Sequence, residues 1–441
     1  MASALERLSV SRSTFFNHAW IYSGIAIVLL GMVLRERAVT LLGIVPLVTA
    51  GGSWLWARYS LTNVEYFREL SEQRVFAGDK VKLHIKVTNR KLLPLASLEI
   101  EDSIADRLRV LEREIVPSGT TGVAVLRITT AMRWFERVTW NLTIECPARG
   151  YFPVGPVDLR SSDAFGFFQQ RERIPGVDHI TVFPAIADLD RIIVPARHLF
   201  GEQKIQRPII TDPMRTIGIR DYRPEDSFRH IHWKATARAQ SLQTKIFEPT
   251  TSIQFGIFLN LDTFERYWEG LDFDRAEGAI VTAATIAAQA VEADHMVGMY
   301  ANGVVGGSDQ ALRVRPSRDD RQLEQILTGL AKLSPIASLD YAAIVRAETS
   351  RFPIGSTVVL VTAIMTERLR AVLDGLLRAN HRVVIVTIGE VDIPRHPRIE
   401  IFPVDLRGLE AYIPEHHHYA VRMSNMPIPP LDPISEPADV H

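Results

Sequence analysis

The stretch IQFGIFLNLD, Ile253 to Asp262, is an apolar run without alternation that ends in an acidic residue. Such a run is typical of a strand that is buried on both faces, as strands are in a parallel sheet. Short apolar runs and helical spacing then alternate along the chain. We expect helices at about 273–293, 318–333, 339–351 and 366–380, and strands at about 296–302, 311–317, 356–364, 382–389 and 399–405. This order predicts a Rossmann-like α/β domain over residues 251–412, with a mainly parallel sheet and helices on both faces.

The chain from residue 63 to residue 195 has a period of two instead. Apolar and polar side chains alternate in VKLHIKV, residues 81–87, and again in VTWNLTIEC, residues 138–146. Each segment predicts a strand with one buried face. Turn sequences separate these segments at short intervals, which favours an antiparallel β-sandwich of the immunoglobulin-like kind. Cys146 occupies an apolar position of the pattern, and we expect it to be a core residue.

Residues 1–62 contain two uncharged apolar runs, 19–34 and 38–57, separated by a charged turn. A membrane-spanning helix needs roughly 20 apolar residues, so we expect a transmembrane hairpin with spans at about 15–34 and 38–57. A cleaved signal peptide is the alternative, but it would lack a second apolar run. Aromatic residues suited to one membrane interface are Trp20, Tyr22, Trp54, Trp56 and Tyr59.

A hairpin places the N-terminus and all residues after the second span on one side of the membrane. Arginines near the spans on that side are Arg7, Arg12, Arg58, Arg68 and Arg74, and those in the turn are Arg35 and Arg37. Positive charge is enriched in cytoplasmic segments, so we expect a protein of the inner (plasma) membrane with cytoplasmic domains.

Charge and composition restrict the classes of partner. The chain has 50 basic and 51 acidic residues and no basic stripe, which argues against a nucleic-acid partner. Its single cysteine excludes an internal disulfide and cysteine-bound structural zinc, and we expect no cofactor. The tail at 413–441 is rich in proline and poor in aromatic residues, so we expect it to be disordered.

The segment RDYRPEDSFRHIHWKATAR, residues 220–238, completes a recognisable order of parts. Two membrane spans, a small β-sandwich, this segment and an α/β domain together resemble the domain of unknown function 58 family. Members of that family are von Willebrand factor A-like proteins that are often associated with MoxR-type AAA+ ATPases. The residues that carry the resemblance are Arg220, Tyr222, Pro224, Asp226, Arg229, Ile231, Trp233, Lys234, Ala235, Ala237 and Arg238. Weaker support comes from residues 149–168 and 182–186, and Glu225 departs from the family pattern, which has glycine there.

The resemblance implies a protein with no established catalytic activity that works with its ATPase partner in assembling or maturing other complexes. It also implies a position for a magnesium site at the strand ends, made by Asp-x-Ser-x-Ser, a Thr and a second Asp. Asp262 matches the first Asp, but Phe264 and Arg266 stand at the serine positions and Ala363 stands at the second Asp. With Asp262 as the one clear remnant, we expect no metal to bind.

The residues of 220–238 can also be interpreted without the resemblance. Asp226 or Ser227 can cap a helix running from Phe228 to Ala239. His230 and His232 are two residues apart, whereas a helical zinc pair needs a spacing of four. We expect residues 196–250 to form a structural junction in which Asp226 pairs with Arg220, Arg229 or Arg238 and Trp233 is the apolar anchor.

Two functional hypotheses remain open at this point. The first is a membrane-anchored, non-catalytic scaffold that binds protein partners, with an AAA+ ATPase of the MoxR type as the implied partner. The second is a cell-envelope enzyme or anion-binding protein that uses the arginine-rich segment at 220–238 as its site. The sequence leaves the oligomeric state open.

Overall fold

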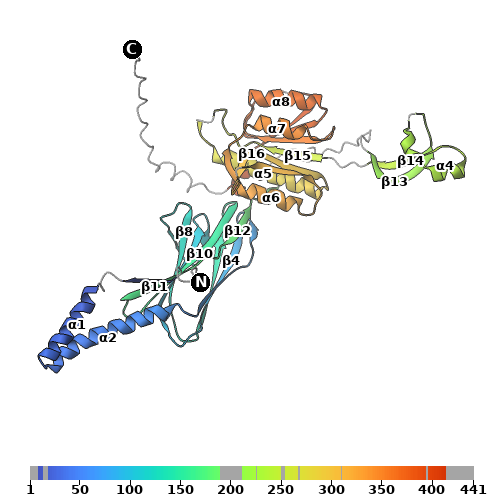
Figure 1. Cartoon of the computed structure of the whole chain (residues 1–441). Coiled ribbons are helices and arrows are strands. Elements are labelled where there is room, and N and C mark those ends of the chain that lie inside the picture. The colour runs from blue at the N-terminus through green and yellow to red at the C-terminus, as the bar shows by residue number, and fades with distance from the viewer. Residues whose placement is uncertain are drawn as a thin grey trace, which may run out of the picture.

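The computed structural model describes residues 8–12, 18–188, 211–224, 226–249, 254–266, 269–308, 310–393 and 396–413. The tail from residue 414, for which we predict disorder, and Glu225 lie outside these residues. The described parts form a helical hairpin, a domain of two β-sheets, a β-hairpin with a short helix, and an α/β domain (Figure 1). We call the third part, residues 211–249, the arm.

The helical hairpin consists of α1 (His18–Val33) and α2 (Arg37–Ser60), which run side by side (Figure 1). Arg35, with φ of 55°, makes the tight turn between them. Gly31 and Gly43 allow close approach, since a Cβ on either would lie within 3 Å of the other helix's backbone. Among the described residues, α2 is long and apolar enough to cross a membrane, and the apolar part of α1, Ile21–Val33, is shorter.

The domain that follows has two sheets around one apolar core. Four strands form one sheet in the order β2 (Val64–Leu70), β4 (Lys80–Asn89), β9 (Arg137–Glu145) and β6 (Arg109–Val110). The other sheet contains β1 (Leu8–Arg12), β11 (Phe168–Ile174), β10 (Gly150–Ser162), β5 (Leu95–Ala105), β8 (Val123–Met132), β7 (Ile115–Pro117), β12 (Asp178–Phe183) and β3 (Arg74–Phe76). Alternate side chains of β4 are buried between the sheets, as the period of two predicts, and Leu98, Ile100 and Ile104 of β5 belong to the same core. Cys146 is fully buried in this core, and burial raises the pKa of its thiol to about 12.

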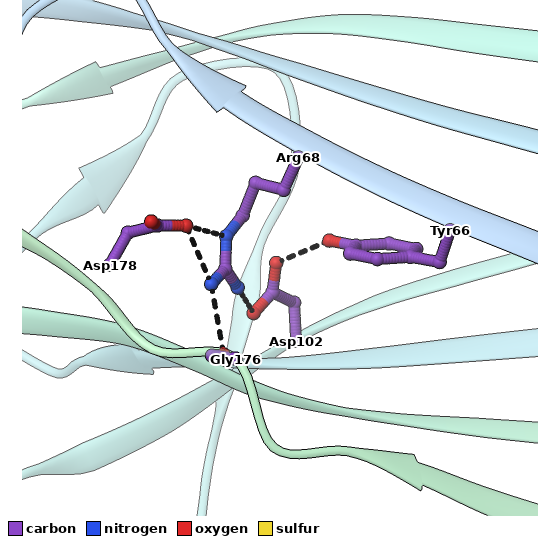
Figure 2. Close-up of polar contacts among 5 residues, drawn as sticks. All are labelled: Tyr66, Arg68, Asp102, Gly176 and Asp178. Carbon is purple, nitrogen blue, oxygen red and sulfur yellow. Dashed lines mark hydrogen bonds and ion pairs between the residues drawn. The ribbon is translucent and has the colours of Figure 1, made fainter.

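A buried polar network also joins the two sheets. Figure 2 shows Arg68 of β2 between the carboxylates of Asp102 on β5 and Asp178 on β12. Arg68 Nη1 donates to Asp102 Oδ1 at 2.7 Å, and the Tyr66 hydroxyl donates to Asp102 Oδ2 at 2.8 Å. Desolvation by burial and the charge of Asp102 raise the pKa of Tyr66, so its hydroxyl remains a donor. Each buried polar group therefore has a partner, which is the condition for such a network to fix one packing of the sheets.

The α/β domain has a central sheet in the order β17-β16-β15-β19-β20-β21, with β18 paired to β16. Its strands are β15 (Gln254–Leu259), β16 (Met296–Val305), β17 (Ala311–Ser317), β18 (Leu333–Ala337), β19 (Thr357–Thr362), β20 (Arg382–Ile388) and β21 (Ile399–Val404). Its helices are α5 (Phe273–Glu292), α6 (Gln322–Lys332), α7 (Tyr341–Thr349), α8 (Glu367–Arg378) and α9 (Leu406–Leu409). β15, β16, β19, β20 and β21 run parallel, and β17 is antiparallel. With β18 left out of the numbering, because it pairs only with β16, the order is 3-2-1-4-5-6, that of a doubly wound sheet.

Helices cover both faces of this sheet, as predicted. Side chains of α5 and α6 pack into one apolar cluster with one face of the sheet, and side chains of α7 and α8 pack into a second cluster on the other face. Every residue of β19 is buried, which explains why the strand sequences are continuously apolar. The expected helices and strands of this domain agree with the observed ones to within a few residues at their ends, but the strand β18 was not predicted.

The β-domain and the α/β domain meet where β10 and β12 approach α6 (Figure 1). Arg149 lies in this seam, 8% exposed, and forms a double hydrogen bond with Glu277 of α5 at 2.8 and 2.9 Å. Its Nη1 also donates to the carbonyl oxygens of Leu330 and Leu333, at 2.6 and 2.9 Å. Arg74 of β3 forms a second, more exposed ion pair with Glu324 of α6.

We predict that Arg149→Ala lowers the stability of the docked domains by about 3–5 kcal/mol, because Glu277 remains buried without its partner. Arg74→Ala is the matched control, since its exposed pair with Glu324 should contribute only about 0–1 kcal/mol. Scanning calorimetry of the detergent-solubilised full chain measures both variants. Equal shifts of the unfolding temperature in the two variants would show that the buried pair does not hold the seam.

Candidate functional site

The arm is built on β13 (Thr211–Asp221) and β14 (Gln243–Pro249), which pair antiparallel with Arg220 opposite Thr244. A 3₁₀ turn at Phe228–His230 and helix α4 (Trp233–Ala239) lie between the two strands. Tyr222 N donates to Leu242 O at 2.8 Å and His232 N donates to Gln243 O at 2.8 Å. The segment 220–238 is thus tied to the strands of its own hairpin by backbone hydrogen bonds.

Asp226 organises the turn of the arm. Both of its carboxylate oxygens accept hydrogen bonds from the Arg220 guanidinium, at 2.7 and 2.5 Å, and Oδ2 also accepts from Arg223 N at 2.9 Å. The hydrogen bonds from Arg220, and then the one from Arg223, hold the pKa of Asp226 below its ordinary value. The pairing of Asp226 with Arg220 is as predicted, but it is a contact within the arm and does not cross a domain boundary.

The single helix expected from Phe228 to Ala239 is wrong. Ile231 adopts an extended conformation, with φ of −64° and ψ of 132°, and bridges to Thr244 of β14. This bridge divides the segment into the 3₁₀ turn and α4, whose cap is His232, with Nδ1 accepting from Ala235 N at 3.1 Å. Asp226 does not serve as the cap because Arg220 and Arg223 already use its oxygens.

The expectation that Trp233 is a buried apolar anchor is also wrong. Trp233 is 69% exposed, and Ile231, which is 4% exposed, is the buried apolar residue among the arm side chains that the structure describes. Phe228 is likewise 69% exposed and lies against Tyr222, with ring centroids 5.4 Å apart. Other exposed residues around them are Arg223, Pro224, Arg229, Lys234 and Arg238. The motif therefore presents two exposed aromatic rings and four exposed basic side chains.

The function of a domain junction is performed by a residue that the sequence did not single out. Arg149 begins the 149–168 stretch, which gave only weaker support for the resemblance, and its partner Glu277 looks like an ordinary charged position of an amphipathic helix. A cavity of about 400 Å³ lies beside this pair at the seam. Its charged lining is engaged within the protein: Arg149 with Glu277, and Lys332 with the Tyr151 ring, 4.2 Å from its centroid.

Polar side chains gather at the carboxyl ends of β15, β16 and β19, where the strand order reverses and ligands bind in doubly wound sheets. Asn302 Nδ2 donates to Asn260 Oδ1 at 2.9 Å and to Asp262 Oδ2 at 3.0 Å. Asn302 Oδ1 accepts from Leu261 N at 2.8 Å, and Asn260 Nδ2 donates to Thr362 Oγ1 at 3.0 Å. Asn260, Asn302 and Thr362 are buried, so this is a closed network that the sequence did not predict.

Asp262 lies at the rim of this network. Burial raises the pKa of its carboxyl group, and the hydrogen bond from Asn302 opposes the shift. Ala363, at the position of the second Asp, is buried at 4% exposure. Within the described residues, no three His, Cys, Asp or Glu side chains are grouped so as to hold a metal ion. The donors around Asp262 are amides, which hold the strand ends together.

We predict that Asn302→Ala destabilises the α/β domain, because Asn260 and Leu261 N lose a buried partner and each unsatisfied group costs about 1–3 kcal/mol. Asp262→Asn is the matched control, because it keeps an oxygen acceptor and should cost little. Thermal unfolding of the full chain in detergent compares the two. A larger loss for Asp262→Asn would mean that its charge, rather than the amide network, is essential.

The comparison of Asp262→Asn with the native chain also gives a predicted pH dependence of stability. A carboxyl group whose pKa is raised in the folded state contributes stability below its unfolded pKa, about 4, and loses that contribution as pH rises through the folded pKa. The stability of Asp262→Asn relative to the native chain should therefore increase from pH 4 toward neutral pH, whichever of the two is the more stable at pH 4. Unfolding temperatures that differ by the same amount at every pH would contradict the raised pKa.

Sequence comparison with known proteins finds a relative of this chain and a family that matches part of it. An uncharacterized protein YeaD of Bacillus subtilis strain 168 is 27% identical over 221 residues, 50% of this chain and 52% of the relative. The chain thus spans about half the length of that curated relative. Solved structures with some likeness include the Spo0M sporulation control protein from Bacillus subtilis, at 12% identity and a TM-score of 0.17 over 28% of this chain and 50% of that one. A non-cellulosomal cohesin from Archaeoglobus fulgidus has 8% identity and a TM-score of 0.18 over 27% of this chain and 91% of that one.

TM-scores this low do not establish a shared fold. The match to a protein family is more informative, because its residues cover most of the arm and nearly all of the α/β domain. Residues 218–405 match the family described as "Protein of unknown function DUF58", the family that the arm motif resembles.

Proposed function

We propose that the protein is a membrane-anchored, non-catalytic adaptor whose arm binds a protein partner. The partner class that the family resemblance implies is a MoxR-type AAA+ ATPase, which would act with the adaptor in assembling or maturing other complexes. In this proposal the hairpin holds the chain at the membrane, the two-sheet domain is a rigid spacer, and the arm and the α/β domain are presented to the partner.

The observation that carries the proposal is the exposure of Trp233 and Phe228 on the arm, at 69% each. Tryptophan and arginine are the residues most enriched at the energetic centres of protein interfaces. The arm combines both types on a backbone fixed by Asp226 and by the bridge at Ile231. A preformed surface of this kind loses little conformational entropy when it binds.

The finer fold assignments belong to the same proposal. We infer that the α/β domain is of the von Willebrand factor A type, which is supported by the 3-2-1-4-5-6 order with one antiparallel edge strand. We infer that the two-sheet domain is immunoglobulin-like, which is supported by two mainly antiparallel sheets around one core. Domains of these kinds serve as binding scaffolds as readily as enzymes, so the role rests on the arm and not on the fold.

Membrane anchoring is supported by the surface of the hairpin. Large apolar side chains are exposed along α1 and α2, including Leu29, Met32, Val33, Leu41, Leu42, Val45 and Val48. A continuous exposed apolar surface of this kind indicates burial in lipid or in another protein. The chain leaves the two-sheet domain after Arg12 and re-enters it at Leu61, which is the path of a hairpin that crosses the membrane twice.

We predict that a photo-crosslinking amino acid at position 233, in native membranes, captures an AAA+ ATPase that mass spectrometry identifies. The same substitution at Leu111, which is 51% exposed on the two-sheet domain, is the matched control and should not capture that ATPase. Trp233→Ala should reduce co-purification of the ATPase about tenfold or more, as expected for a central interface tryptophan. Unfolding temperatures of both variants should equal that of the native chain.

Repeated failure to recover an ATPase from position 233 would contradict the proposed partner class. Equal capture from positions 233 and 111 would mean that the arm is not the binding surface. Loss of phosphate-type anion binding by a folded Trp233→Ala or Arg229→Ala chain would instead favour an anion site.

The proposed orientation gives a separate prediction. A reporter enzyme fused after residue 441 should be active when it requires the cytoplasm and inactive when it requires the periplasm, because arginines flank the spans on the domain side. A fusion in the turn between Arg35 and Arg37 is the matched control with the opposite result. Periplasmic activity of the C-terminal fusion would reverse the orientation.

A further inference from the structure

One end of the two-sheet domain carries large exposed apolar side chains on three loops. The loops are 90–94, 133–136 and 163–167, and we call them together the proximal rim. Leu92 is 76% exposed, Trp134 61%, Phe135 63% and Phe165 65%. Soluble surfaces rarely gather several large apolar side chains in this way without a partner.

Strand register places the three loops at one end of the domain. Val64, the first residue of β2 after α2, is opposite Asn89, which precedes loop 90–94. Leu95 is opposite Met132, which precedes loop 133–136. Ser162 is opposite Gln169 on the far side of loop 163–167. The proximal rim therefore surrounds the point where α2 joins the sheets.

Hydrogen bonds connect two of these loops to the end of α2. Arg90 N donates to Asn63 O at 3.0 Å, and Lys91 Nζ donates to Thr62 O at 2.7 Å. Phe135 N donates to Lys91 O at 3.3 Å, which joins loop 133–136 to loop 90–94. Loops 90–94 and 133–136 are thus bound to the two residues that follow Leu61.

The third loop is adjacent to the other point of attachment. Arg12, the last residue of β1, is opposite Phe168 of β11, and the chain continues from Arg12 toward α1. With its amide turned to donate, the Gln170 side-chain nitrogen lies 2.7 and 2.8 Å from Ala57 O and Arg58 O at the end of α2. Ala57 is fully buried and Leu61 belongs to the core of the domain, so α2 enters the domain without a linker.

The turn at 133–136 is held in a costly conformation. Phe135 has φ of 53°, a region that bulky side chains rarely adopt. Arg133 N donates to Glu136 Oε2 at 2.5 Å and Asn89 Nδ2 donates to Arg133 O at 2.9 Å, which fixes the turn. The consequence is that Trp134 and Phe135, neighbours in sequence, are both exposed at its tip. Strain of this kind is usually retained at a functional surface.

Basic side chains accompany the apolar ones. Exposed residues at the rim and at the end of α2 include Arg58, Arg90 and Arg133, and Lys91 is half-buried between them. The Arg58 guanidinium lies 5.9 Å from the Trp54 ring centroid, where α2 carries its aromatic residues. Aromatic and basic side chains in combination are typical of surfaces that lie at the boundary between water and lipid.

We propose that the proximal rim lies against the headgroup layer of the bilayer that α2 crosses, with Leu92, Trp134, Phe135 and Phe165 among the lipids and the basic side chains on anionic headgroups. The proposal rests on the membrane anchoring proposed above. As a consequence, the three loops of the rim and α2 together would fix the orientation of the two-sheet domain on the membrane. The α/β domain, docked at the opposite ends of β10 and β12, is then held roughly 40 Å from the membrane, the length of a 13-residue strand.

Depth measurements on the full chain in lipid nanodiscs test this proposal. Cys146 is the single cysteine and is buried, so a Cys146→Ala chain accepts one nitroxide label at a chosen position. Labels at Leu92→Cys and Phe165→Cys report the rim. A label at Val48→Cys on α2 is the reference for lipid, and one at Ile354→Cys, a residue 64% exposed on the α/β domain, is the reference for water.

We expect the labels at 92 and 165 to lose accessibility to an aqueous nickel chelate relative to the label at 354, and to reach headgroup depth. If the labels at 92 and 165 are as accessible as the label at 354 while the label at 48 is in the hydrocarbon, the rim proposal is wrong but the proposed membrane anchoring stands. If the label at 48 is itself in water, the membrane anchor fails, and the rim proposal with it. Rim labels that are in water in nanodiscs but protected in native membranes would assign the rim to a protein instead.

Lipid composition tests the basic side chains. In discs of phosphatidylcholine with phosphatidylglycerol, the rim labels should lie deeper than in discs of phosphatidylcholine alone. Arg133→Gln should remove part of that difference, and a substitution of Arg313, an exposed arginine of the α/β domain, should leave it unchanged. Identical depth in both lipids would overturn the assignment of the basic residues to anionic headgroups.

Discussion

The arrangement of this chain depends on one buried ion pair between domains. Arg149 and Glu277 lie in the seam with both carboxylate oxygens and all the guanidinium nitrogens hydrogen-bonded, two of those bonds reaching backbone carbonyls at the end of α6 and the start of β18. A buried charge without its partner is strongly unfavourable, so the pair accepts a single relative position of the two domains. The chain itself continues across the seam, since Phe183 and Ala187 pack into the core of the α/β domain.

At its other end, the two-sheet domain is also attached rigidly, to α2, but by apolar packing and an amide group instead of an ion pair. Apolar packing of Ala57 and Leu61, together with the amide of Gln170, joins α2 to the sheets without a flexible connection. The network of Arg68, Asp102 and Asp178 then holds the two sheets against each other (Figure 2). Rigid attachment at both ends is what a spacer requires, because a force or a position set at one end is then transmitted to the other.

The arm differs from these buried regions in its energetics. Among its described residues, the arm is held by backbone pairing, by the Arg220–Asp226 pair and by the buried side chain of Ile231, while Trp233 and Phe228 remain exposed. Because Trp233 and Phe228 are exposed, their apolar surface does not contribute to the free energy of folding, to which burial adds roughly 25 cal/mol per Å². In the proposed adaptor function, binding to a partner would bury these side chains and recover that contribution.

The sequence by itself determined the periodicities and therefore the classes of structure. Continuous apolar strands such as that at 254–259 can only be buried on both faces, the alternation at 81–87 requires one face in water, and the uncharged run at 38–57 requires an apolar environment. These are properties of local side-chain pattern, so they could be predicted before any coordinates existed. The tertiary structure alone decided which charges are buried, because burial depends on residues distant in sequence.

Arg149 and Arg220 cannot be distinguished by their sequence surroundings. Arg149 pairs with Glu277, 128 residues away, and so connects two domains. Arg220 pairs with Asp226, six residues away, and so stabilises a local turn. The position of Trp233 also depends on a distant residue: Ile231 forms a strand bridge with Thr244, α4 begins only at Trp233, and the indole is exposed there. Spacing along the chain gives the residues that can meet, and only the packing of the whole molecule selects those that do.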